Sequence, residues 1–255
     1  MIKYIYLFLF ILQVQSLRFF PFLFTRRKYT PPKKYITIMP GGLRGFYMLG
    51  ICKYLQETEK LSELDYLGAS AGAWCSLICC YNKDIDNLIN QLFQSEYLYT
   101  NITSPNDLQY KFRNFLLDNY NSNDFDLSKL NIALCQLEHL NLETKIISNF
   151  NSLERAIDCC IVSSHIPYIT SKGLIKRFDD KISFDGGLTS GFPPKYIPNY
   201  YIINPSLYDE QYSNTKFLLQ LIKYNHTSDT LQEMYNLGYE NAKKNKNIIK
   251  DIFNR

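Results

Sequence analysis

Residues 35–45 read YITIMPGGLRG, and residues 64–80 read LDYLGASAGAWCSLICC. Each stretch begins with a short apolar run, which is typical of a buried parallel strand. In both, a glycine-rich turn follows, and then apolar residues recur at helical spacing, over 46–60 and 73–80. Two consecutive strand–turn–helix units favour an α/β fold with parallel strands.

The rest of the chain continues this alternation of strands and helices. We expect strands at 132–137, 145–147, 181–184 and 200–203, helices at 153–163, 215–224 and 230–250, and surface helices over 84–123. The predicted fold class is therefore α/β, a three-layer α/β/α sandwich with a mostly parallel central sheet.

Composition and charge exclude several classes of protein. The 255 residues are 46% hydrophobic and 20% charged with a net charge of +4, which indicates one large globular domain and argues against a nucleic-acid partner. Seven cysteines and three histidines show no zinc-ligand or disulfide spacing, and no calcium loop is present. We therefore expect no metal, no cofactor and no obligatory protein partner, and most cysteines to be small buried side chains.

Residues 1–30 form a hydrophobic N-terminal segment ahead of a domain over 31–255. The apolar run 4–12 has the length of a signal-peptide core and is too short to span a bilayer. One interpretation of the segment is a signal peptide that is cleaved after Ser16. A second interpretation is an uncleaved anchor, because residues 19–24 extend the apolar character before Arg26. A third interpretation is a soluble arm packed on the domain.

Gly68, Ser70 and Gly72 have the GxSxG spacing of a nucleophile elbow. A sharp strand-to-helix turn needs small residues on both sides of the serine, and the following helix directs free N–H groups toward an oxyanion. A purely structural turn is the alternative for GxSxG alone. Its position between an apolar strand and an apolar helix favours the nucleophile.

Gly41, Gly42, Leu43, Arg44 and Gly45 form a second glycine-rich turn before a helix. Its exposed N–H groups suit either a phosphate or the oxygen of a tetrahedral intermediate. The turn lacks the lysine of a phosphate-binding loop and the spacing of a dinucleotide turn, so we favour the oxyanion interpretation.

Asp185, Gly186 and Gly187 follow a predicted strand. A carboxylate at a strand end, uncovered by two glycines, is suited to act as general base for a serine. A glycine-supported β-turn is the simpler alternative for this motif taken alone.

The three motifs in this order resemble those of the patatin-like phospholipase family. The stretches AIDCCIVSSHIP at 156–167 and FDGGLTSGFP at 184–193 also resemble the family, and the match covers about 35–204. The N-terminal segment and the C-terminal helices over 205–255 lie outside it. The resemblance implies the family fold.

The resemblance further implies a Ser-Asp dyad, with Ser70 as nucleophile and Asp185 as base. The residues expected to donate N–H groups to the oxyanion are Gly41, Gly42, Leu43 and Ala71, and those expected to support the motifs are Arg44, Gly45, Gly68, Gly72, Gly186 and Gly187. Arg44 either fixes its loop or meets a phosphate headgroup. His165 is expected to be structural, and it is the candidate if a triad is used instead. Pro40 stands where the family usually has a third glycine, so one N–H donor is missing.

The implied activity is hydrolysis of fatty-acyl esters of phospholipids or other glycerolipids at a membrane or lipid-droplet surface. Two alternatives remain: a lipid-binding scaffold that has lost catalysis through Pro40, and an acyltransferase that uses the same acyl-serine. The N-terminal segment suggests membrane association or the secretory pathway, with the cytoplasmic face as the alternative if the segment is not a signal.

Overall fold

A computed structural model of the chain describes residues 34–139, 141–171, 173–189, 191–209, 212 and 227–254. The N-terminal segment over 1–30, with its signal-peptide and anchor interpretations, lies outside the described residues. The helix predicted at 215–224 lies outside them as well.

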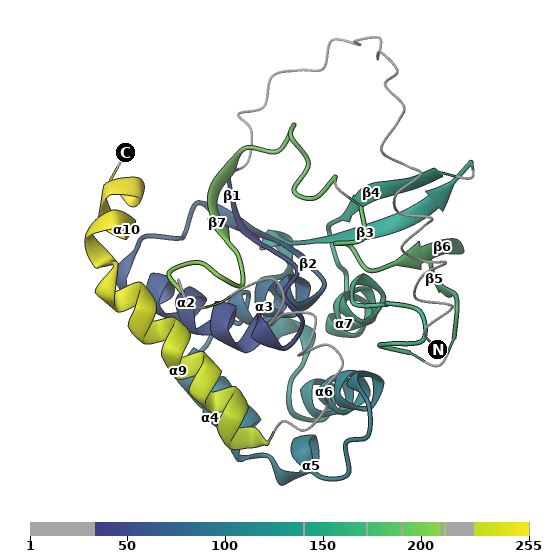
Figure 1. Ribbon diagram of the computed structural model, residues 1–255, viewed down its shortest axis with the longest axis horizontal. Coiled ribbons are helices and arrows are strands. Elements are labelled where there is room, and N and C mark those ends of the chain that lie inside the picture. The colour runs from purple at the N-terminus through teal and green to yellow at the C-terminus, as the bar shows by residue number, and fades with distance from the viewer. Residues whose placement is uncertain are drawn as a thin grey trace. The chain divides into compact units, whose positions relative to one another are not determined.

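The described residues form a mixed central sheet flanked by helices (Figure 1). Its strand order is β5-β6-β3-β2-β1-β7, with β4 also paired to β3. The strands are β1 (Lys34–Ile38), β2 (Leu64–Ala69), β3 (Leu130–Glu138), β4 (Asn141–Ile147), β5 (Lys176–Phe178), β6 (Lys181–Phe184) and β7 (Asn199–Ile203). This confirms the predicted α/β class and is consistent with a three-layer α/β/α fold.

The sheet is parallel at its centre and antiparallel on one side. Strands β7, β1, β2 and β3 pair in parallel, whereas β4 and β6 pair antiparallel to β3, and β5 pairs antiparallel to β6. The antiparallel part includes β5, which the sequence pattern did not predict because it is only three residues long. The site described below lies where the parallel and antiparallel parts meet at β3.

The helices are α2 (Gly45–Thr58), α3 (Ala71–Cys79), α4 (Ile85–Gln94), α5 (Glu96–Tyr99), α6 (Pro105–Asn119), α7 (Leu153–Ser163), α9 (Ser228–Lys244) and α10 (Lys246–Phe253), with short 3-10 turns at Gly42–Arg44, Ser122–Asp124 and Leu127–Lys129. Local capping explains several starts: the side chains of Asp84, Ser104 and Ser152 accept N–H bonds at the beginnings of α4, α6 and α7. Among the described residues, none of these helices combines the length and apolar character that crossing a bilayer requires.

Side chains of the two central strands alternate between two apolar clusters, as the pleat requires. Ile36, Ile38 and Tyr66 belong to the large core shared with the helices. Leu67 and Ala69 belong to a smaller cluster. All seven cysteines are buried and free, which confirms their interpretation as small core side chains.

Helix α9 packs closely along α2 (Figure 1). Two glycines permit this approach: a Cβ on Gly238 would overlap the carbonyl oxygen of Tyr47, and one on Gly50 would overlap that of Tyr235. The C-terminal part of the chain, outside the recognised motifs, is thus packed on the helix that begins at the glycine-rich loop.

The single helix predicted over 230–250 is wrong in one respect, since the structure divides it at Asn245. The side-chain amide of Asn245 donates to the carbonyl of Asn241 at 2.8 Å. Asparagine side chains compete with the backbone for such bonds, which favours helix ends over helix interiors.

The register of β3 brings two distant motifs together. Ala133 pairs with the last residue of β2, directly before Ser70. Two residues further along β3, Cys135 pairs with Phe184 of β6. Because β6 is antiparallel to β3, the chain after Phe184 runs back toward Ala133, and Asp185 approaches the edge where Ser70 leaves β2.

Candidate active site

Ser70 occupies a strained turn between β2 and α3. Its backbone has φ 56° and ψ −126°, a region that non-glycine residues seldom adopt. A Cβ on Gly68 would overlap the carbonyl of Gly72, and a Cβ on Gly72 would overlap the carbonyl of Ile38. The tight turn predicted from GxSxG is therefore present, and it needs glycine on both sides of the serine.

Asp185 directly follows β6 and is 3% exposed. Its N–H donates to the carbonyl of His165 at 2.8 Å, and its Oδ1 accepts the N–H of Gly187 at 2.8 Å. The other carboxylate oxygen, Oδ2, is buried and has no hydrogen-bond partner among the described residues. One oxygen is therefore held by the backbone while the other remains available to a proton.

Burial controls the ionisation of this carboxylate. It raises the pKa of Asp185 to about 6, and the neighbouring Ser70 side chain and the Gly187 N–H partly offset the rise. No hydrogen bond of standard geometry joins Ser70 to Asp185 among the described residues, so the hydroxyl lies near the carboxylate without completing one. A carboxylate with a pKa near neutrality beside a hydroxyl is suited to general-base chemistry.

The predicted oxyanion loop lies against the other two motifs. Gly42 has φ 52° and begins a short 3-10 turn. A Cβ on Gly187 would overlap the Pro40 ring, and one on Gly45 would come 3.1 Å from the Ala71 Cβ. Pro40 therefore does not separate its loop from the DGG motif.

The predicted oxyanion donors occupy positions whose N–H groups have no partner within their own element. Gly42 and Leu43 are the first residues of the 3-10 turn, and Ala71 is the first residue of α3. Among the described residues, the hydrogen bonds between backbone groups include none from the N–H of Gly41, Gly42 or Ala71. Helix N-termini also carry positive potential, so a negative oxygen is favoured there.

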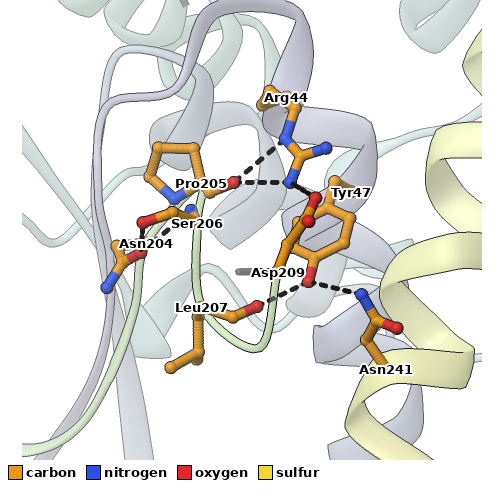
Figure 2. A network of polar contacts seen from close by, with 8 residues as sticks. All are labelled: Arg44, Tyr47, Asn204, Pro205, Ser206, Leu207, Asp209 and Asn241. Atoms are coloured by element: carbon orange, nitrogen blue, oxygen red, sulfur yellow. Dashed lines mark hydrogen bonds and ion pairs between the residues drawn. The ribbon is translucent and has the colours of Figure 1, made fainter. Parts of the chain in front are cut away.

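Arg44 is buried and fixes the loop rather than facing solvent (Figure 2). Its Nε and Nη2 donate to the carbonyl of Pro205 at 2.9 and 2.7 Å, and Nη2 also meets Asp209 Oδ2 at 2.7 Å. The guanidinium lies over the rings of Tyr47 and Tyr212, at 3.9 and 4.0 Å from their centroids. These contacts favour loop fixation over contact with a lipid headgroup.

The same network reaches α9 through Tyr47 (Figure 2). The Tyr47 hydroxyl donates to the carbonyl of Leu207 at 2.5 Å and accepts from the Asn241 amide at 3.1 Å. Sequence reasoning missed these partners of Arg44 and Tyr47, because they come from segments about 160 to 195 residues away with no motif of their own.

His165 has neither ring nitrogen available to Ser70. Its Nδ1 lies 2.9 Å from Ser171 Oγ, its Nε2 lies 3.3 Å from the Leu174 carbonyl, and the ring stacks on Phe184. Burial lowers the pKa of His165 to about 4, with the Leu174 contact opposing this and Lys176 adding to it. These contacts match the structural role expected of His165. Both ring nitrogens are engaged, so neither is available to accept the Ser70 proton, as a triad would require.

Ser163, at the end of α7, is a contact of the site to which sequence reasoning assigned no role. Its hydroxyl accepts the N–H of Ser70 at 2.9 Å and donates to the carbonyl of Ala133 at 2.8 Å. The serine pair that precedes His165 within the AIDCCIVSSHIP stretch was the available signal.

A cavity of about 540 Å³ opens elsewhere, between α6, α7 and β5. The residues that line it are Tyr110, Ser152, Glu154, Arg155, Asp158, Ile161, Val162, Lys176, Arg177, Phe178 and Asp179. Neither Ser70 nor Asp185 lines this cavity, so its lining does not identify the acyl-binding part of the candidate site.

Comparisons with known proteins add little to this geometry. No protein-family model matches the chain, and no curated protein matches it. The chain is similar to one in the heterodimeric complex ExoU–SpcU from the type III secretion system of Pseudomonas aeruginosa, with TM-score 0.40, 13% identity, and coverage of 88% of this chain and 52% of that one. The chain thus spans about half the length of that neighbour, and a likeness at this level carries no weight in assigning function.

Proposed function

We propose that the protein is a lipid acyl hydrolase that acts through an acyl-serine on Ser70 with Asp185 as general base. The observation that carries the proposal is the strained Ser70 turn beside a buried carboxylate, one oxygen of which has no hydrogen-bond partner in the described part of the chain. The resemblance of the three motifs to patatin-like phospholipases supplies the reaction class.

In the first half of the reaction, Ser70 Oγ attacks the ester carbonyl carbon while its proton passes to Asp185. The carbonyl oxygen becomes an oxyanion, which the N–H groups of Gly41, Gly42 and Ala71 stabilise, with Leu43 as a further donor. As the intermediate collapses, the carbon–oxygen bond to the alcohol breaks and Asp185 returns its proton to that leaving oxygen. An acyl-serine and a free alcohol or lysolipid result.

In the second half, Asp185 takes a proton from water, and the hydroxide oxygen attacks the acyl carbon. The bond to Ser70 Oγ breaks, the proton returns to that oxygen, and a fatty acid leaves. The Asp185 pKa of about 6 leaves most of the carboxylate ionised at pH 7 and still basic enough to share a proton.

The proposed substrates are phospholipids or other glycerolipids at a membrane or lipid-droplet surface. The N-terminal apolar run over 4–12 supports association with membranes or entry to the secretory pathway.

Fatty-acid release from mixed phospholipid and neutral-lipid vesicles, in the presence of a chelator, tests the function. The wild type is compared with Ser70→Ala and Asp185→Asn. Two matched controls are Ser76→Ala and Asp180→Asn. Ser76 is a buried serine of α3 whose hydroxyl has no partner among the residues that the structure describes, and Asp180 is an exposed aspartate. We expect release by the wild type and both controls, and a loss of at least about a hundredfold in each dyad variant.

The same assay separates the alternatives. Transfer of label to an added lysolipid or glycerol instead of water would identify an acyltransferase. Vesicle binding without release, unchanged by Ser70→Ala, would identify a scaffold. Equal release by the wild type and both dyad variants would contradict the dyad.

A further inference from the structure

Ser163 links the strained serine to the central sheet. Strands β2 and β3 pair as far as Ala69 and Ala133, and the chain then turns away at Ser70. The Ser163 hydroxyl lies between the Ser70 N–H and the Ala133 carbonyl, at 2.9 and 2.8 Å. It therefore connects Ser70 to β3 directly beyond the last paired residues of β2.

The two bonds fix the orientation of that hydroxyl. A serine hydroxyl has one proton, and here it points to the Ala133 carbonyl, so a lone pair faces the Ser70 N–H. Ser163 is fully buried, with 0% exposure, so water does not take over either bond. Loss of the hydroxyl would remove the bond to the buried Ser70 N–H and one bond to the Ala133 carbonyl.

The backbone of Ser163 bonds to Gly186, the residue directly after Asp185. Its carbonyl, which α7 leaves unpaired at its C-terminal end, accepts the N–H of Gly186 at 3.0 Å. The glycine at that position also lies against Ala133, whose carbonyl oxygen a Cβ on Gly186 would overlap. One residue thus touches the chain at the nucleophile and at the residue after the acid.

We infer that Ser163 is a positioning residue that holds the Ser70 backbone in the correct position relative to Asp185. This inference rests on the proposed function. Because φ 56° is an unfavourable backbone state for serine, a bond that favours this state keeps Oγ aimed at the substrate carbon and the acid. Ser163 touches neither substrate nor the reacting atoms, so it acts only through Ser70.

Steady-state kinetics of the full chain on a soluble p-nitrophenyl ester test this role, with thermal unfolding by circular dichroism as the check on folding. The variants are Ser163→Ala and Ser163→Cys, in which a somewhat larger thiol that hydrogen-bonds only weakly replaces the hydroxyl. The matched control is Ser183→Ala, because the Ser183 hydroxyl is equally buried and also bridges two partners, the Gln136 amide and the Lys181 carbonyl.

We expect kcat to fall by about ten- to a hundredfold in both Ser163 variants, with KM and the pH midpoint unchanged, because geometry and not binding is lost. Ser183→Ala should keep kcat. The inference is overturned if either folded Ser163 variant stays within about twofold of wild-type kcat, or if Ser183→Ala loses as much. If Ser163→Ala does not fold, Ser163→Cys decides. A wild type with no esterase activity would overturn the proposed function, and this inference with it.

Discussion

The N–H of Gly187 donates to Oδ1 of Asp185 at 2.8 Å, so the residue two positions after the acid orients it. The second glycine of the motif is needed here for space as well, because a side chain at Gly187 would overlap the Pro40 ring. With Oδ1 held, Oδ2 is the oxygen left to exchange a proton with Ser70.

The acid limb of the pH profile should report Asp185. Burial raises the pKa of Asp185 to about 6, and only the ionised carboxylate accepts a proton. We therefore expect kcat/KM on a soluble ester to rise from pH 4 to pH 7 with a midpoint near pH 6. Initial rates across this range measure it.

His165→Gln is the control for this midpoint, because the His165 ring bonds to Ser171 and Leu174. The folded variant should keep the midpoint. A midpoint that moves with His165, or one at the ordinary pKa of an exposed aspartate, would contradict Asp185 as the base.

Asp185→Asn should stabilise the protein while it abolishes activity. The folded state holds the Asp185 proton more tightly than the unfolded chain does, so ionisation removes stability as the pH rises from about 4 through 6. The gain in unfolding free energy for the variant should therefore be larger at pH 8 than at pH 4, by up to ~3 kcal/mol. Urea denaturation at both pH values measures this gain, and Asp180→Asn, at an exposed site, should show no such difference.

Arg44→Met should destabilise the fold without changing headgroup preference. The substitution removes the guanidinium from its partly buried ion pair with Asp209 and from the Pro205 carbonyl, which costs about 2 kcal/mol. Denaturant midpoints measure this loss, with the exposed Arg177→Met as control. If Arg44 instead met a headgroup, the ratio of rates on anionic and zwitterionic vesicles would change while stability would not.

Gly238→Ala should separate α9 from α2, because the added Cβ would overlap the Tyr47 carbonyl oxygen. Overpacking of this kind costs about 1–3 kcal/mol or more. Gly173→Ala is the matched control, since its Cβ would meet nothing closer than 3.8 Å. Equal melting temperatures for the two variants would contradict the close helix packing.

The sequence predicted the elements around the site well because their signals are local. The apolar runs before Pro40 and Gly68 became β1 and β2, and the helical spacing after Gly45 and Ser70 became α2 and α3. A glycine turn between a strand and a helix is specified by a few adjacent residues, so it can be identified without knowledge of the rest of the fold.

Contacts between distant segments could not be predicted in the same way. The partners of Arg44 lie in the loop after β7, and the position of Ser163 depends on how α7 ends against β3. Tertiary packing determines both the Arg44 contacts and the position of Ser163, and neither produces a hydrophobic periodicity or a motif spacing in the sequence. The break at Asn245 was missed because one asparagine is a weak signal within an otherwise helical pattern.

Covalent labelling tests the central claim most directly. The full chain is incubated with an alkyl fluorophosphonate, digested, and analysed by peptide mass spectrometry. We predict one adduct on Ser70, absent from Ser70→Ala and formed at least about a hundredfold more slowly in Asp185→Asn. Labelling that persists in Ser70→Ala, or that forms at an equal rate without the Asp185 carboxylate, would contradict the dyad.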